Sequence, residues 1–319
     1  RNCRIAGRTI YLTQQGDIPY SLVMKSSFVT ARTEKQRTST VKYFAGNQQL
    51  PFLIVFAFLQ AVWSASAGVV VYPAPAGEEL SKDYEVEVDG KKVPVYLARV
   101  APQDPLRRWK AMDDKANSAQ YFELASFVSF DMQDPVNVVV TCPKPVQSAC
   151  ILPKSSGIVP GVKDGRITFR LSRPMPVTIE VNGTWVGALH LFANPPEKDI
   201  PQPGGTNIVY FGPGIHELDH LTVKSGTTVY IAGGAVVRGI IKPEEKFHIS
   251  SHSGLKIYQP LILLEGSNIT VRGRGIIDGT GCTTHSKHMV SIRGSDITVE
   301  GIILRDSSIW TVPIRKSDR

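Results

Sequence analysis

His216, Glu217 and His220 follow the spacing H-E-x-x-H within GIHELDHLTV, residues 214–223. On a helix, two histidines four residues apart share one face and can bind one Zn²⁺, while the glutamate acts as general base on the metal-bound water. The neighbouring sequence disfavours a helix. FGPG at 211–214 leads into the motif and contains two glycines and a proline, and LTVKSGTTVYI at 221–231 follows it and is rich in β-branched residues. On a strand the two histidines would lie about 13 Å apart. We therefore predict a loop and a strand at this position and no metal site.

A second stretch, GRGIIDG at 273–279, begins like the phosphate-binding loop of dinucleotide-binding proteins. The third glycine of that motif is replaced by Asp278, and the following residues, TGCTT, do not begin a helix. We predict no nucleotide binding and no cofactor, and we expect Asp278 to form a turn.

The excess of positive charge lies near the N-terminus. The chain of 319 residues has a net charge of +8, and residues 1–68 contain eight Lys or Arg against two Asp or Glu, a net of +6. The other residues contain 28 basic and 26 acidic groups, a net of only +2. The calculated pI of about 9.3 therefore gives no support for nucleic-acid binding.

Residues 1–67 are predicted to be a leader with a secretory signal peptide. Its apolar run, at about 51–63, is too short to span a bilayer and precedes SASAG, which contains an A-x-A cleavage site ending at Ala67. A buried core helix is the alternative for this run. The first methionine is Met24, so the true start codon is open. We expect a secreted or periplasmic protein that has no membrane association after cleavage.

Cysteine usage is compatible with export. Cys142 and Cys150 are close enough in sequence to form a disulfide in an oxidising compartment, which would leave Cys282 unpaired. The sequence does not decide whether the first two are bridged.

Residues 68–197 are predicted to form an antiparallel β-sandwich. Short alternating runs of apolar and polar residues flank Asp-Gly at 89–90 and Asn-Gly at 182–183, two dipeptides that suit the tight turns of β-hairpins. The segment NPPEKDIPQPGGT at 194–206 has four prolines and two glycines, so we place a domain boundary there.

Residues 198–319 contain internal repeats. EGSNITVRG at 265–273 matches RGSDITVEG at 293–301 with an offset of 28 residues, and IAGGAVVRG at 231–239 resembles VRGRGIIDG with an offset of 40. Short strands that recur at uneven intervals and end in Gly, Asn or Asp are typical of a right-handed parallel β-helix. The predicted fold is thus all-β, a sandwich followed by the start of a β-helix.

The end of the sequence resembles a known family. GIIDGTG at 275–281, followed by DITVEGIILRDSSIWTV at 296–312, is similar to the polygalacturonases of glycoside hydrolase family 28, which carry G-x-I-D-G-x-G and then roughly N-I-T-I-x-G-I-x-L-x-N-S-P-x-W. The resemblance covers about 205–319. It implies inverting hydrolysis of a pectin-like polysaccharide, in which one carboxyl group protonates the leaving oxygen and carboxylates on the opposite face activate water. A monomer with the polysaccharide as its partner is expected.

The catalytic motifs of that family have no match in this sequence. N-T-D-G, G-H-G and R-I-K do not occur, and the one D-D pair, at 113–114, lies in the predicted sandwich. We expect these motifs beyond Arg319, so that the chain is the front portion of a larger enzyme, with a truncated β-helix, and is inactive by itself. The sequence therefore assigns no catalytic residue, leaves the substrate-binding residues unknown, and leaves sugar, linkage and endo or exo action open.

Three aromatic residues near this end are candidates for the neighbourhood of the substrate. Trp310 could stack on a sugar ring, but a position buried between coils is the expected one. His285 and His288 could line a loop near a substrate groove, although a solvated loop is the default interpretation.

Two alternatives to a polygalacturonase stay open. A sandwich in front of a β-helix also resembles the dextranases and isopullulanase of glycoside hydrolase family 49. A non-catalytic carbohydrate-binding β-helix protein would account equally well for the missing acidic motifs.

Overall fold

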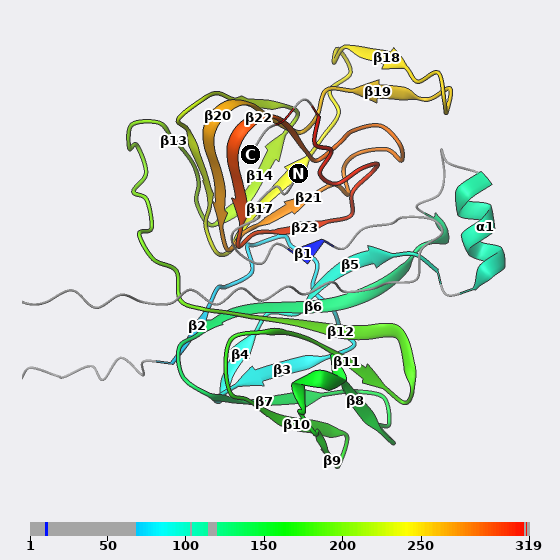
Figure 1. Ribbon diagram of the computed structural model, residues 1–319. Coiled ribbons are helices and arrows are strands. Elements are labelled where there is room, and N and C mark those ends of the chain that lie inside the picture. Colours follow the sequence, from blue (N-terminus) through cyan, green and yellow to red (C-terminus); the bar gives the residue numbers. More distant parts are fainter. Residues whose placement is uncertain (1–9, 12–67, 103, 114–119, 316, 318–319) are drawn as a thin grey trace, which may run out of the picture. The chain divides into compact units, whose positions relative to one another are not determined.

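The computed structural model describes residues 10–11, 68–102, 104–113, 120–315 and 317. They form a β-sandwich followed by a parallel β-helix (Figure 1), which confirms the predicted all-β class. The described helices are α1 (Pro105–Asp113) and the short 3-10 helix η2 (Lys154–Ser156), and neither is long enough to cross a bilayer. The apolar run and the cleavage site of the predicted leader lie outside the described residues.

Two sheets face each other in the sandwich. Their strand orders are β4-β3-β7-β10-β9 and β2-β6-β12-β11-β8, with β5 beside β6. The bounds are β2 Val69–Val71, β3 Glu85–Val88, β4 Lys91–Val93, β5 Tyr96–Val100, β6 Glu123–Met132, β7 Val136–Thr141, β8 Ala149–Leu152, β9 Gly161–Lys163, β10 Arg166–Leu171, β11 Pro176–Val181 and β12 Thr184–Asn194. All paired strands are antiparallel except β6 and β12, which run parallel because the chain crosses to the facing sheet and returns between them.

The two predicted hairpins are confirmed. Asp89 and Gly90 join β3 to β4 with φ of 45° and 76°, and Asn182 and Gly183 join β11 to β12 with φ of 54° and 73°. Two successive positive φ angles match the right-handed twist of the paired strands.

Strand β6 is buried on both faces. Val128, Phe130 and Met132 are fully buried in the core between the two sheets, whereas Phe127 packs on the β-helix, where it meets Val236. This double burial explains why apolar residues of β6 occupy both faces of the strand instead of alternating strictly with polar ones.

The β-helix has three faces along which strands of successive coils stack in parallel. The first face holds β15 and the beginnings of β20 and β22, the second holds β13, β16 and the ends of β20 and β22, and the third holds β14, β17, β21 and β23, with β1 beside β23. The bounds are β1 Ile10–Tyr11, β13 Ile208–Phe211, β14 Gly214–Leu218, β15 Leu221–Val223, β16 Thr228–Ile231, β17 Ala235–Gly239, β20 Ile262–Gly273, β21 Ile276–Asp278, β22 Val290–Glu300 and β23 Ile303–Arg305.

Strands β20 and β22 continue across the corner between the first two faces. Each contains a glycine at the corner, Gly266 or Gly294, with φ of 130° and 151°, and a Cβ on Gly294 would collide with the carbonyl oxygen of Gly266. Beside them, Asn268 and Asp296 take left-handed conformations with φ of 56° and 52°. These equivalent turn positions were expected from the repeat, and short polar side chains tolerate them.

The two sequence repeats correspond to stacked strands. Strands β20 and β22 pair with the predicted offset of 28, and the offset of 40 is correct for β17 and β21, where Val236 lies beside Ile276. The offset of 40 is wrong for β16, because Val229 lies beside Val271, 42 residues later. The chain needs five residues to pass from Ile231 to Val236 but only three between their partners, Gly273 and Ile276, which accounts for the difference of two.

The three described cysteines are free thiols. Cys142 follows β7 in one sheet of the sandwich, whereas Cys150 belongs to β8 in the other sheet, so the bridge that the sequence left open is not formed. Cys282 is buried in the β-helix, and burial raises the pKa of its thiol to about 11.

Candidate functional site

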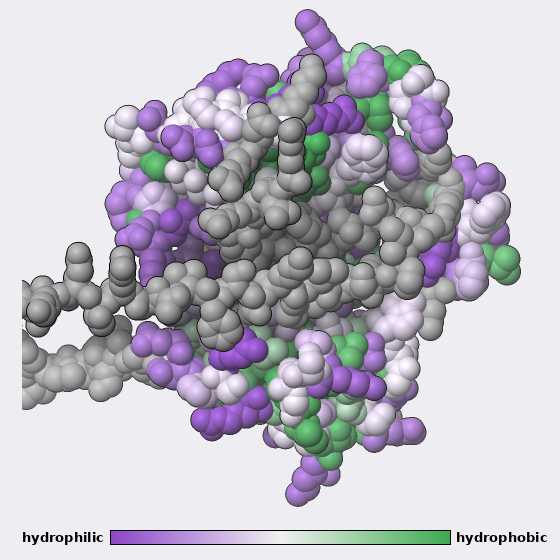
Figure 2. Space-filling model, in the orientation of Figure 1, coloured by the Kyte–Doolittle hydropathy of each residue, from purple (hydrophilic) through white to green (hydrophobic). Residues whose placement is uncertain are grey.

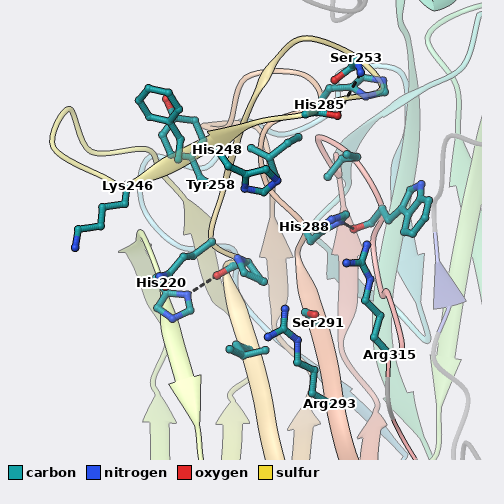
Figure 3. A pocket seen from close by; sticks show the side chains of 18 of the residues that line it. His220, Lys246, His248, Ser253, Tyr258, His285, His288, Ser291, Arg293 and Arg315 are labelled. Atoms are coloured by element: carbon teal, nitrogen blue, oxygen red, sulfur yellow. Dashed lines mark hydrogen bonds between the residues drawn. The ribbon is translucent and has the colours of Figure 1, made fainter.

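A groove of about 960 Å³ lies on the first face of the β-helix (Figure 3). Thr222, Leu263 and Ser291 form part of its floor, and they occupy one ladder across β15, β20 and β22. Side chains alternate across a strand, so the neighbours of these residues on the same strands, such as Val223 and Leu264, point inward to the core. The stacked coils therefore provide a flat outer surface as the floor.

The walls of the groove come from segments outside the stacked strands. The hairpin of β18 (Phe247–Ile249) and β19 (Lys256–Tyr258) projects from the β-helix, and Figure 2 shows hydrophobic atoms near its outer end. Two exposed side chains belong to it, Phe247 and Ile249, at 48% and 57% exposure. The loop that carries His285 and the segment after β23 contribute the other lining residues.

Positive charge collects in this groove without negative charge. Lys246, Arg293 and Arg315 line it, and no Asp or Glu is among the described lining residues. No described carboxylate lies within ion-pair distance of these three cations. Arg315 instead stands over the ring of Trp310, with its Cζ atom 5.8 Å from the ring centroid. The arrangement can bind an anion supplied from outside the described chain.

Histidines also gather along the groove. Five line it, namely His220, His248, His252, His285 and His288. His285 and His288 lie in a loop, as predicted, and both line the groove. Burial lowers the pKa of His288 below its ordinary value, and the charge of nearby Arg315 acts in the same direction. The hydrogen bond with the backbone of Trp310 opposes this shift but does not outweigh burial, so the ligand-free protein favours the neutral form of His288.

Trp310 differs from the expected buried position. It lines the groove with 57% of its surface exposed, and its ring centroid lies 5.8 Å from that of His288. The prediction of a buried aromatic is wrong because another residue of the same segment, Val312, packs on the β-helix core together with Ile302 and Leu304. An exposed indole face is available for stacking on a ligand ring.

Asp278 lies outside the groove and forms the predicted turn. Its carboxylate accepts hydrogen bonds from the backbone N–H and the hydroxyl of Thr280, at 2.9 and 2.7 Å. It also forms ion pairs with Arg238 at 3.1 Å and Arg305 at 2.9 Å. Burial opposes ionisation of Asp278, but Arg305 and the Thr280 hydrogen bonds outweigh it and lower the pKa of the carboxyl below its ordinary value. A carboxylate held this way is unsuited to proton transfer at neutral pH.

The H-E-x-x-H stretch forms a strand followed by a turn, as predicted. His216 and Glu217 lie on β14, and His220 lies in the turn before β15. The His216 ring donates from Nε2 to the carbonyl of Gly212 at 2.7 Å, while His220 donates from Nδ1 to the carbonyl of Pro260 at 2.6 Å. Among the described residues, no three His, Cys, Asp or Glu side chains are close enough together to hold a metal ion.

Sequence reasoning missed most of the groove. Arg293 had a usable signal, since it begins the second repeat at the outward position equivalent to Glu265. Lys246 and Arg315 had none, because their segments belong to no repeat and to no motif of the resembled family.

Comparisons with known proteins give two likenesses among solved structures. No protein-family model matches the chain, and no curated protein matches its sequence. Among solved structures, the chain is similar to Dex49A from Penicillium minioluteum, with 13% identity, a TM-score of 0.46, and coverage of 75% of this chain and 74% of that chain. It is also similar to the Yersinia enterocolitica Family 28 exopolygalacturonase, with 12% identity, a TM-score of 0.29, and coverage of 79% and 55%. Likeness at this level carries no argument about the family of this chain.

Proposed function

We propose that the groove binds an anionic polysaccharide and that the chain belongs to a secreted polysaccharide hydrolase of polygalacturonase type, acting on pectin-like polymers. The observation that carries this proposal is the composition of the groove. It combines an exposed indole, Trp310, with three cations, Lys246, Arg293 and Arg315, and no described carboxylate.

Each component has a counterpart on a uronic-acid polymer. A pyranose ring has an apolar face that can stack on Trp310, and a uronate carboxylate can accept charged hydrogen bonds from Arg293 or Arg315. A neutral glucan such as dextran or pullulan would stack equally well but would leave the cations without partners. Charge therefore favours a pectin-like substrate over the substrates of the family 49 alternative.

Hydrolysis requires more than the described groove supplies. Inverting cleavage uses a pair of carboxyl groups on opposite sides of the scissile bond. Three described acids that adjoin lining residues in sequence or in the sheet are each paired with a lysine: Asp219 with Lys242, Glu245 with Lys287 and Glu265 with Lys224. In our proposal Trp310 and the cations of the groove hold the polymer, while the cleaving carboxylates lie elsewhere. A non-catalytic carbohydrate-binding protein is the second candidate, favoured by the same absence of acids from the described lining.

Titration calorimetry with oligosaccharides of equal length tests this function. We expect an oligogalacturonate to bind at least about tenfold more tightly than an isomalto- or malto-oligosaccharide. Trp310→Ala should weaken oligogalacturonate binding by about tenfold, since stacking contributes roughly 0.5–1.5 kcal/mol beyond area burial. Trp185→Ala is the matched control, because Trp185 is 41% exposed on the sandwich. Equal affinity for neutral and acidic sugars, or no effect of Trp310→Ala, would overturn the proposal.

Activity separates the two candidates. Release of reducing ends from polygalacturonate by the full-length gene product supports a hydrolase, and tight binding without release supports a carbohydrate-binding protein.

Export and a monomeric state are part of the same proposal. N-terminal sequencing of the secreted protein should give a mature chain that begins near Gly68, and a mature chain that keeps residues 51–63 would contradict export by this signal.

A further inference from the structure

Lys287 is a buried cation that the proposed binding surface does not use directly. Its side chain is only 1% exposed, although its neighbour His288 lines the groove. Its ammonium group donates to the carbonyls of Asp219 at 2.6 Å and Ile240 at 3.2 Å, and to both carboxylate oxygens of Glu245 at 2.7 and 2.9 Å. Three N–H donors are thus shared among four acceptors, so the buried charge is fully satisfied.

The groups bound by Lys287 belong to separate segments around the groove. Asp219 immediately precedes His220, at the edge of the floor, and Glu245 immediately precedes Lys246, where the β18–β19 hairpin begins. The ammonium group also lies 5.9 Å from the ring centroid of Tyr258, on the second strand of that hairpin. One side chain therefore connects the floor to the hairpin wall.

The main chain of Lys287 extends this connection to the wall that carries Trp310. The N–H of Lys287 donates to the hydroxyl oxygen of Ser308 at 3.1 Å, and that hydroxyl donates back to the carbonyl of Lys287 at 2.8 Å. Ser308 lies two residues before Trp310. The floor, the hairpin, the His288 loop and the Trp310 segment all meet at this residue.

The geometry points to Lys287 as a positioning residue for saccharide binding, an inference that rests on the proposed function of the groove. The walls are loops and a two-stranded hairpin, which have little stability of their own compared with the stacked coils. A ligand that contacts several walls binds more tightly when they are already held in place, because the cost of ordering them is not taken from the binding free energy. Lys287 holds the walls together before the ligand arrives.

Lys287→Met tests this role, with Lys242→Met as the matched control. Methionine keeps much of the lysine length but loses the charge and the donors. Lys242 is an exposed lysine that binds the carboxylate of the same Asp219 at 2.9 Å. We expect Lys287→Met to speed amide hydrogen exchange in residues 244–258 and 283–289 by at least about tenfold, with no change in β20. Oligogalacturonate affinity should fall by at least about tenfold, and Lys242→Met should alter either quantity by no more than about twofold.

A double variant separates positioning from general stability. Adding Glu245→Leu to Lys287→Met removes the unpaired buried carboxylate and should restore the unfolding midpoint, since a buried ion pair can be replaced by apolar side chains. It does not restore the contacts with the carbonyls of Asp219 and Ile240, so affinity should stay low. Recovery of affinity together with stability would overturn the inference.

The outcome for Lys287 is distinguishable from the outcome for the proposed function. If the wild-type protein binds no oligogalacturonate, the proposed function fails, whereas the exchange measurement still tests whether Lys287 orders the walls. Unchanged exchange in the hairpin and the His288 loop would overturn the inference whatever the ligand. If Lys287→Met does not fold, Glu245→Gln carries the same test, because it keeps the shape of the side chain and loses only its charge.

Discussion

Charged residues form two clusters in this protein, and the two are built in opposite ways. The junction cluster lies between the sandwich and the β-helix and consists of Glu78, Arg238, Asp278 and Arg305. Its two acids and two arginines alternate, with ion-pair distances between 2.5 and 3.1 Å. The groove cluster consists of Lys246, Arg293 and Arg315, and it contains cations alone among the described residues.

The difference separates a structural use of charge from the binding use that we propose for the groove. In the junction cluster, Glu78, Asp278 and Arg305 are almost completely buried, and burial of ions is tolerated only when each has a partner. In the groove, water solvates the cations, so they need no internal partner and stay available to an anionic ligand. The pairing of a charge, rather than its residue type, therefore indicates its role. Asp278, the carboxylate within the most family-like motif, belongs to the structural cluster.

Breaking the junction cluster should give the largest effect. Arg305→Met leaves Glu78 and Asp278 buried with one cation fewer, and we expect the free energy of unfolding to fall by about 3–5 kcal/mol. Chemical denaturation followed by circular dichroism measures this loss. Arg173→Met, at an exposed position of the sandwich, is the control and should change stability by less than about 0.5 kcal/mol. A loss below about 1 kcal/mol for Arg305→Met would mean that these ion pairs do not stabilise the junction.

Removing charge from the groove should give the converse result. Arg293→Gln and Arg315→Gln should each weaken oligogalacturonate binding by about tenfold, or 1.4 kcal/mol, and change the free energy of unfolding by less than about 0.5 kcal/mol. Titration calorimetry and denaturation of the same samples measure both quantities.

Salt provides the control for this prediction. Rising ionic strength should weaken oligogalacturonate binding by the wild type more than by the variants, because salt screens the exposed groove charges. A large loss of stability in either variant, or unchanged affinity, would remove the distinction between the two clusters.

The fold was predictable where the sequence determines local geometry. The Asp-Gly turn at 89–90 and the Asn-Gly turn at 182–183 require positive φ, and such dipeptides adopt it at little cost. The coils were predictable because Gly294 and its equivalents recur with the stacking period. The parallel pairing of β6 with β12 was not predictable, since it depends on where the chain returns after five intervening strands.

The site was less predictable, because the groove arises from the packing of coils rather than from a motif. Trp310 was identified, but its exposure depends on which residues of its segment face inward, and Val312 takes that place. The β18–β19 hairpin is an insertion between coils, so nothing in the repeat indicates that Lys246 lies near Arg293. Lys287 carries no sequence signal, since two of its four acceptors are backbone carbonyls and the other two belong to Glu245, 42 residues earlier in the chain.

The smallest effect we predict concerns pH and sharpens the contrast between the clusters. The Nδ1–H of His288 donates to the carbonyl of Trp310 at 3.4 Å, and Arg315 and His248 are the charged or titratable groups that influence it. Burial holds its pKa below the ordinary value of 6.5 against the opposing hydrogen bond with Trp310, and the charges of Arg315 and His248 act in the same direction as burial. The ligand-free fold therefore favours neutral His288, and this contribution to stability is present above pH 6.5 and decreases as the pH falls below it.

A bound uronate carboxylate should reverse that preference, because it stabilises the imidazolium. Oligogalacturonate affinity should then rise about threefold to tenfold as the pH falls from about 7.5 to 5.5, a range in which a carboxyl group with an ordinary pKa stays ionised. Calorimetry in two buffers with different ionisation enthalpies should show proton uptake on binding, and His288→Gln should reduce both the uptake and the pH dependence. Affinity that is independent of pH, or protons released rather than taken up, would show that His288 does not face the saccharide carboxylates. The junction cluster provides the internal reference, because the pKa of Asp278 is held below its ordinary value and its ion pairs stay charged throughout this pH range.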